Sequence, residues 1–293
     1  MALSEAAISG IYLAACRAEL DALKPGNVHR FAGGHGMDVA VFETSAAVSA
    51  PAISAANQPV GRRVLAAMEA TWSAVGMNTN LGILLLCAPL AAAAEFAPPG
   101  SASPETRLRD ALACVLGALT FEDAEDIFAA IALASPGGLG HREDHDVRSP
   151  PRISLMEAMR IASPTDAIAS QYVRCFADIF DLGLPAIRAA RAAGETEMWP
   201  AIACFLAFAA DLPDSHVARK FGPARAEDLR GRMASAVKQL NLMGNENERI
   251  GLLLGFDAEL KAEGLNPGTS ADLTVASIFA ERLVHALQEE VRG

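Results

Sequence analysis

Residues 23–38, LKPGNVHRFAGGHGMD, separate two long segments of helical periodicity. Pro25 fixes φ and cannot continue a helix, and the glycines allow the close backbone approaches of an ordered loop. Its charged, titratable or amide side chains are Lys24, Asn27, His29, Arg30, His35 and Asp38. Because loops of this kind often carry function, we expect the stretch to form part of a site, with a surface connector as the alternative.

Apolar residues recur at helical spacing on both sides of this loop. The segment before it, residues 4–23, has Ser4 as a candidate N-cap, and the next helix runs from Asp38 or Glu43 to about residue 56. Further helices are expected over residues 62–75, from 83 onward, 106–119, 122–134, 153–161, 166–180, 184–193, 199–210, 224–242, 247–261 and up to 287. We find no strand alternation, repeat or linker. The sequence predicts one all-α domain over residues 1–293, with about a dozen packed helices and polar, glycine-rich loops that form the site.

The composition agrees with tightly packed helices rather than a β-sandwich. Of 293 residues 52% are hydrophobic and only 5% aromatic, and the mean hydropathy is +0.24. The apolar run over residues 81–94 is too short to span a bilayer, so we interpret it as a buried helix. A net charge of −11 and a pI of about 5.0 argue against nucleic-acid and anionic-membrane partners.

The five cysteines lie far apart and show no CxxC spacing. They are typical of small core residues in a reducing cytosol rather than of a disulfide framework or a zinc site. The N-terminal segment carries Glu5, Arg17 and Glu19 within a helical pattern, which a signal peptide would not. We therefore expect a cytoplasmic protein. An alanine-rich helical surface also leaves a homodimer open.

Three more polar stretches interrupt the helical pattern. In residues 76–82, GMNTNLG, turn amides precede an apolar helix and offer donors to an anion, with capping as the alternative for Asn78 and Thr79. In residues 135–151, His141 and His145 lie four apart, which is the spacing of two metal ligands on a helix. The alternative is that this stretch is a solvated loop without a metal. Residues 211–222 carry Asp214 as a candidate N-cap of a short helix.

The last two polar features lie toward the C-terminus. On the short helix, His216 and Lys220 share a face and Arg219 lies beside them. Thr269 or Ser270 is the expected N-cap of the final helix, with Asp272 in its first turn. The sequence contains no Walker loop, no GxGxxG after a strand, no HExxH and no GxSxG motif.

Four short motifs occur in a fixed order along the chain: KPG at 24–26, HGMD at 35–38, NT at 78–79 followed by Gly82, and PGTSADL at 267–273. In order and approximate spacing they resemble the triphosphoribosyl-dephospho-CoA synthase family, the transferases that make the prosthetic-group precursor of citrate lyase and malonate decarboxylase. The chain departs from that pattern at residues 27–29, where the family tends to end in an acid. It departs again at residues 80–81, where the family typically has His-Lys. Residues 138–146 look more like a divergent archaeal and methylotroph branch.

The resemblance implies an all-helical fold and a defined reaction. The ribose C1′ of ATP is joined to the 2′-hydroxyl of 3′-dephospho-CoA and adenine is released, so ATP and dephospho-CoA are the expected partners. Displacement at an anomeric carbon passes through an oxocarbenium-like state. The site then needs a base for the hydroxyl, a donor for the leaving adenine and cations for the triphosphate. Mg²⁺ is the expected cofactor, since it commonly bridges triphosphate oxygens.

The resemblance also implies roles for individual residues. Asp38, Asp272 and His35 are the candidate catalytic residues: the two aspartates bind Mg²⁺ or act as the base, and the histidine positions the ribose or the triphosphate. Glu143 and Asp146 are further candidate metal ligands. The residues expected to bind nucleotide or phosphate are Lys24, Asn27, Asn78, Thr79, Arg219, Lys220 and Ser270. For each of these residues a capping or salt-bridge role is the alternative.

Two other functions compete with this one. The departures at His29, Asn80 and Leu81 favour a related enzyme that moves a phosphorylated ribose onto another acceptor, for instance in tetrahydromethanopterin-type cofactor synthesis. The third hypothesis is a helical nucleotide- or CoA-binding protein without catalysis.

Overall fold

The computed structural model describes residues 3–34, 36–97, 100–135, 147 and 149–289. Within these ranges the chain forms fourteen α-helices, one π-helical segment and no extended strand, which confirms the all-α prediction. The elements are α1 (Glu5–Asp21), α2 (Val39–Ser54), α3 (Val60–Val75), α4 (Leu81–Phe96), α5 (Pro104–Gly117), α6 (Phe121–Ala134), α7 (Leu155–Ala162), α8 (Ala167–Val173), η1 (Ile179–Gly183), α9 (Leu184–Ala192), α10 (Trp199–Asp211), α11 (Ser215–Phe221), α12 (Pro223–Leu240), α13 (Glu246–Ala262) and α14 (Gly268–Glu289).

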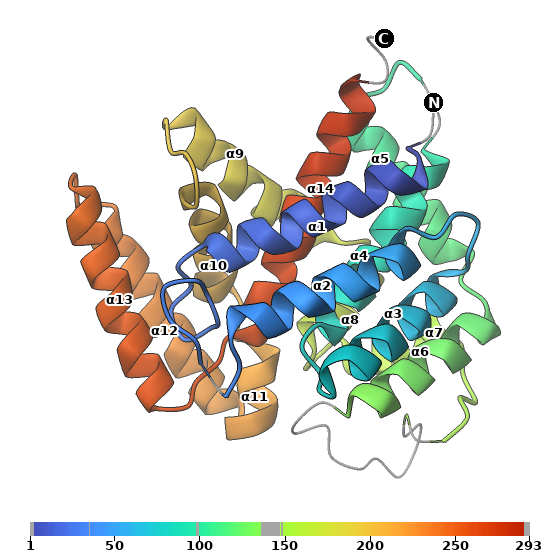
Figure 1. Cartoon of the computed structure of the whole chain (residues 1–293), viewed down its shortest axis with the longest axis horizontal. Helices are drawn as coiled ribbons and strands as arrows, with labels where there is room; N and C mark the ends of the chain where they lie inside the picture. The colour runs from blue at the N-terminus through green and yellow to red at the C-terminus, as the bar shows by residue number, and fades with distance from the viewer. Residues whose placement is uncertain (1–2, 35, 98–99, 136–146, 148, 290–293) are drawn as a thin grey trace.

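Two helices, α4 and α14, form the centre of the molecule. Almost every side chain of α4 is buried, which confirms that the apolar run from residue 81 is a core helix. This helix packs against α2, α3, α5 and α14, and α14 packs in turn against α1, α4, α5 and α10. Figure 1 shows α14 crossing behind α1 between two groups of helices, α12 and α13 on one side and α2, α3 and α6 on the other.

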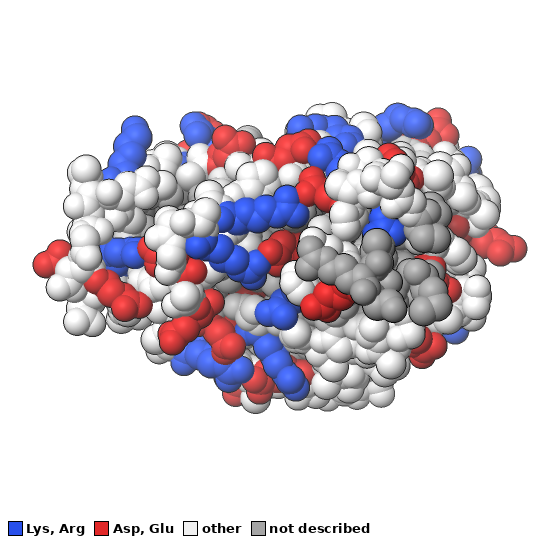
Figure 2. Space-filling model, turned by 90° about the horizontal axis from the view of Figure 1, so that it is seen from above, with Lys and Arg blue, Asp and Glu red and all other residues white. Residues whose placement is uncertain are grey.

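No single helix in the described ranges is long and apolar enough to cross a bilayer, although the bent pair α10–α11, with a 48° break, meets the criteria of length and composition. All five cysteines are free, as expected, but only Cys16, Cys87 and Cys204 are buried. Cys114 is exposed, so the expectation of core residues is wrong there. Figure 2 shows one face of the molecule, where Lys and Arg side chains lie beside Asp and Glu.

Predicted N-caps start three of the helices. The side chains of Ser4, Asp38 and Asp214 accept hydrogen bonds from the first-turn amides of α1, α2 and α11. Because the first four amides of a helix lack intrahelical partners, these contacts fix where each helix begins.

The predicted helix over residues 166–180 is wrong, because the chain breaks after Val173. Cys175 and Phe176 adopt positive φ values of 50° and 59°. The Phe176 ring is fully buried, and the Gln171 side chain bonds to both the amide and the carboxylate of Asp178 across the break. Burial and these hydrogen bonds offset the cost of left-handed backbone in non-glycine residues.

The last helix also begins earlier than predicted. It starts at Gly268, so Thr269 and Ser270 lie in its first turn rather than at its N-cap, and Asp272 lies beyond that turn. The Thr269 hydroxyl accepts from the His216 amide at 3.1 Å, and the Ser270 hydroxyl donates to Asp214 at 2.9 Å. These side chains therefore tie α14 to α11 instead of capping α14.

The loop of residues 23–38 is fixed to α13 and to the turn that follows it. The Gly26 amide donates to Asp257 at 2.8 Å, and Asn27 donates to Asn266 at 2.8 Å. Gly26 has φ of +83°, and a Cβ there would lie 2.9 Å from the Leu265 carbonyl oxygen. Only glycine fits this turn, because it needs both a left-handed backbone and a close approach.

Gly61→Ala should destabilise the contact between α3 and α6. A Cβ at Gly61 would lie 2.6 Å from the Asp123 Cα and 2.7 Å from its carbonyl oxygen, so the helices would have to separate. We expect a loss of about 1–3 kcal/mol in the free energy of unfolding, measured by urea denaturation. The matched control is Gly251→Ala on the exposed side of α13, where nothing lies within 4 Å. It should stabilise the protein by about 0.5–1 kcal/mol. Equal effects of the two substitutions would contradict this account.

Candidate active site

A cavity of about 1230 Å³ opens between the ends of several helices. Its wall includes the N-terminal turns of the two central helices, α4 and α14, together with residues of α6, α7, α8 and α11. Helix N-termini present amide donors and positive potential, so the central helices supply anion-binding character in an acidic protein. Pockets for a single small molecule measure roughly 300–1,000 Å³, so this cavity lies above the usual range for one such ligand.

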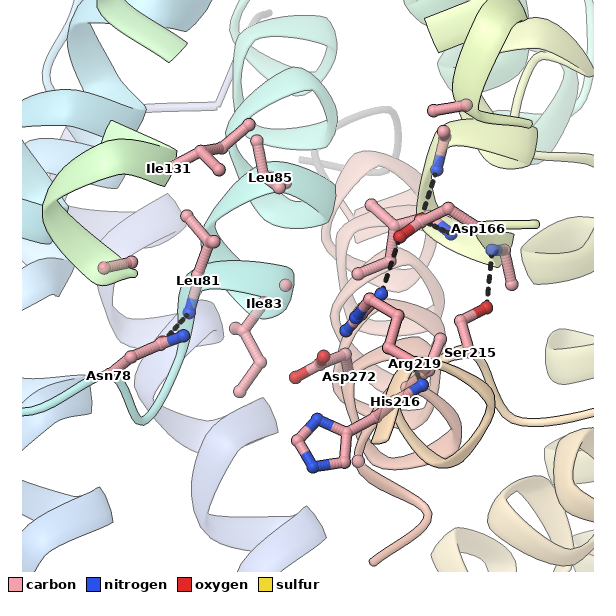
Figure 3. Close-up of a pocket in the computed structure, with 18 of the residues that line it drawn as sticks. Asn78, Leu81, Ile83, Leu85, Ile131, Asp166, Ser215, His216, Arg219 and Asp272 are labelled. Atoms are coloured by element: carbon pink, nitrogen blue, oxygen red, sulfur yellow. Dashed lines mark hydrogen bonds and ion pairs between the residues drawn. The ribbon is translucent and has the colours of Figure 1, made fainter. Parts of the chain in front are cut away.

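Asp272 of α14 is the carboxylate that points most plainly into this cavity, in the space between Ile83 and His216 (Figure 3). It makes no hydrogen bond or salt bridge with any described residue. Burial raises the pKa of Asp272 well above its usual range, and the nearby Asp214 and Glu19 carboxylates raise this pKa further. An unpaired carboxylate with such neighbours has a strong electrostatic preference for a cation or a proton.

Gly82 on α4 makes room for that carboxylate. A Cβ at this position would lie 2.1 Å from Asp272 Oδ2 and 2.8 Å from the Ile168 side chain. The glycine that follows Asn78-Thr79 is therefore required by the close approach of α14 to the start of α4.

Arg219 of α11 extends toward α8 across the cavity wall (Figure 3). One of its terminal nitrogens donates to Asp166 at 2.7 Å, while its buried Nε has no hydrogen-bond partner among the described residues. The positive charge of Arg219 acts to lower the pKa of Asp272. Asp166 is itself fixed, because it accepts from the Ile168 and Ala169 amides at the start of α8.

Asp214 joins the two helices that carry Arg219 and Asp272. One carboxylate oxygen accepts from the amides at the start of α11, and the other accepts from the amide and hydroxyl of Ser270, each at 2.9 Å. Ser270 is buried and does not line the cavity, so the structure uses its hydroxyl to hold α14 in place.

Glu19 of α1 lines the cavity, although sequence reasoning did not assign it to the site. The Lys24 ammonium lies 2.5 Å from its carboxylate and also donates to the Val28 carbonyl at 2.6 Å and to Asn27 at 3.2 Å. Burial raises the pKa of Glu19, and Lys24 acts to lower it. Lys24 is fully buried behind Glu19, whereas Asn27 reaches the cavity wall.

Asn78 and Thr79 both line the cavity where α4 begins. Asn78 accepts from the Leu81 amide at 3.1 Å, which confirms the capping contact considered for it. The Thr79 hydroxyl donates to Ser45 at 2.7 Å on α2. Binding of a nucleotide by either residue stays a prediction.

The other predicted residues lie elsewhere. Asp38 is exposed and caps α2, and Lys220 is exposed with its ammonium 5.1 Å from the centre of the Phe221 ring; neither lines the cavity. His35, Glu143 and Asp146 fall outside the described residues. From the predicted set, the structure brings to the cavity wall Asn27, Asn78, Thr79, Arg219 and Asp272.

A metal ion would have few protein ligands in this cavity. The described residues contain no group of three or more His, Cys, Asp or Glu side chains placed to bind one. Mg²⁺ with a triphosphate commonly needs only one or two protein carboxylates, because phosphate oxygens and water complete its coordination. Asp272 fits that requirement, since its carboxylate faces the cavity and has no hydrogen-bond or salt-bridge partner in the part of the chain that the structure describes.

Residues 5–291 match the family model described as ATP:dephospho-CoA triphosphoribosyl transferase. The chain belongs to this family. Membership over nearly the whole length confirms the resemblance drawn from the four short motifs, and with it the class of transferases.

A solved structure shares the fold of this family member. It is the crystal structure of an Archaeoglobus fulgidus protein with the provisional name triphosphoribosyl-dephospho-CoA synthase. The two chains are 24% identical, with a TM-score of 0.61 over 81% of this chain and 96% of the other. Among proteins with curated functions, none matches this sequence significantly.

Asp272→Asn should make the substrate-free protein more stable at pH 8. The raised pKa of Asp272 means that its ionised form is disfavoured in the folded state, so stability falls as pH rises above the ordinary pKa of aspartate. We expect the midpoint of thermal unfolding to rise by at least about 2 °C at pH 8. The gain should shrink toward pH 4.

The matched control for this prediction is Glu69→Gln, which also removes one negative charge but at an exposed position on α3. It should leave the midpoint unchanged at both pH values. A lower midpoint for Asp272→Asn at pH 8 would show that the carboxylate contributes to folding rather than to binding.

Proposed function

We propose that this chain transfers the 5-triphosphoribosyl group of ATP to a ribose hydroxyl of 3′-dephospho-CoA and releases adenine. Membership in the family supports the reaction. The observation that carries the proposal to this chain is the Asp272 carboxylate, which has no hydrogen-bond or salt-bridge partner among the described residues and lies with Arg219 in the wall of a large cavity. ATP and dephospho-CoA are then the two substrates.

The reaction is a substitution at the anomeric carbon of ATP. The oxygen of the acceptor hydroxyl bonds to C1′ of the donor ribose as the bond from C1′ to adenine N9 breaks. The hydroxyl proton passes to a base, and adenine leaves with the bonding electrons and takes up a proton. Positive charge develops on the ribose in the transition state, so nearby carboxylates stabilise it.

Glu19 is our candidate for the base. It is buried at the cavity wall, and the Lys24 ammonium beside it favours the ionised carboxylate that a base must be. In this proposal Lys24 acts through Glu19 rather than on a phosphate. Asn27, which bonds to Lys24 and to Asn266, holds this corner of the cavity.

The triphosphate is proposed to lie against Asp272, Arg219 and the first turns of α4 and α14. Asp272 would hold Mg²⁺, which when bound supplies positive charge to the triphosphate oxygens. Arg219 lines the cavity and its guanidinium is oriented by Asp166, so it can contribute positive charge to a bound phosphate. A cytoplasmic location is also part of the proposal, supported by five free cysteines.

Adenine release from ATP should depend on dephospho-CoA. Chromatography of the reaction, with mass spectrometry of the product, should show one adenine for each triphosphoribosylated dephospho-CoA. Release with a different hydroxyl acceptor, such as a pterin precursor, but not with dephospho-CoA would favour the related transferase. Tight ATP binding without release under any of these conditions would favour the non-catalytic protein.

Arg219→Gln should raise the KM for ATP at least about ten-fold, because a charge-assisted contact to phosphate is worth more than a kilocalorie. The matched control is Lys220→Gln on the same helix, whose ammonium is exposed and does not line the cavity. It should change the KM for ATP less than two-fold. Thermal denaturation should first establish that both variants are folded. A larger rise in the KM for ATP in Lys220→Gln than in Arg219→Gln would then place the triphosphate elsewhere.

A further inference from the structure

The two proposed substrates pose a problem of discrimination, and this inference rests on the proposed function. ATP and 3′-dephospho-CoA are both adenosine 5′-diphosphates with free ribose hydroxyls. They differ beyond the second phosphate, where ATP carries a third phosphate and dephospho-CoA carries an uncharged pantetheine chain. A site that uses one as donor and the other as acceptor must recognise that difference.

The cavity has two walls of opposite character. On one side lie Asp166, the N-cap of α8, Arg219 of α11 and Asp272 of α14. On the other lie Leu85 of α4 and Ile131 of α6 (Figure 3). The polar wall suits a triphosphate, whereas on the second wall the described residues of α6 and α7 offer no charged group that could neutralise a phosphate.

The second wall is built mainly by α6 and α7, which pack side by side (Figure 1). In the described ranges these two helices contribute no charged side chain to the cavity wall. Their apolar contributions are Ile127, Phe128, Ile131, Leu155, Met159 and Ile161.

We propose that this α6–α7 wall binds the uncharged pantetheine chain of the acceptor and so decides which adenosine nucleotide receives the triphosphoribosyl group. A chain of methylene and amide groups gains by leaving water for an apolar wall. A third phosphate would lose its hydration there without gaining a partner, so ATP is excluded from the acceptor position.

Binding and turnover with dephospho-CoA and with ADP test this assignment, because ADP has the same ribose and diphosphate but no pantetheine chain. In calorimetry the wild-type protein should bind dephospho-CoA at least ten-fold more tightly than ADP. Ile131→Gln, which places an amide on the half-buried α6 wall, should raise the KM for dephospho-CoA at least ten-fold and leave the KM for ATP within two-fold. Its affinity for ADP should not change.

Leu133→Gln is the matched control, since Leu133 is half-buried on the same helix but does not line the cavity. It should leave both KM values within two-fold. Met159→Gln on α7 provides a second test should Ile131→Gln fail to fold. An equal rise in the KM values for ATP and dephospho-CoA, or no rise in the KM for dephospho-CoA, would overturn the inference.

The outcomes also separate this inference from the proposed function. Turnover with dephospho-CoA, together with equal affinity for dephospho-CoA and ADP, overturns the subsite and leaves the reaction standing. Tighter binding of dephospho-CoA that Ile131→Gln abolishes, without any release of adenine, supports the subsite and overturns the reaction.

Discussion

The close packing of α14 against the start of α4 is the constraint on which this structure depends. Gly82 is the contact point, because a Cβ there would occupy the place of the Asp272 carboxylate. The same contact joins the two helices that carry the centre of the core. A carboxylate is thereby held beside the first turn of an apolar helix that has no cation to pair with it. The contact between α4 and α14 therefore belongs both to the core and to the wall of the site.

The acids around the cavity differ in how far the fold satisfies them. Asp214 receives four hydrogen bonds and Asp166 receives two amide bonds and an arginine, so both serve to fix helix ends. Glu19 has the Lys24 ammonium, whereas Asp272 has no such contact with any residue that the structure describes. Because an unsatisfied charge that is largely removed from water costs stability, the electrostatic cost is greatest at Asp272, whose carboxylate faces the ligand space.

Local rules predicted much of the fold, and tertiary packing explains what they missed. Helical periodicity and capping chemistry located most helices, including the caps Ser4, Asp38 and Asp214. The break near Phe176 was not predicted. The cost of its left-handed backbone is offset by burial and by the hydrogen bonds of Gln171, and periodicity reveals neither. Motif order pointed to Asp272. Glu19 carried no such signal, because its approach to the cavity depends on how α1 packs against α14.

The two departures from the family pattern, at His29 and at Leu81, lie in different parts of the structure. His29 is fully buried, 3.3 Å from Asp257, and the Lys261 ammonium contacts both. Its substitution for an acid therefore concerns how the loop docks on α13, away from the cavity. Leu81, by contrast, lines the cavity where the family typically has a lysine. Arg219 offers a cation from the opposite wall, so this chain can balance a triphosphate from α11 instead of from α4.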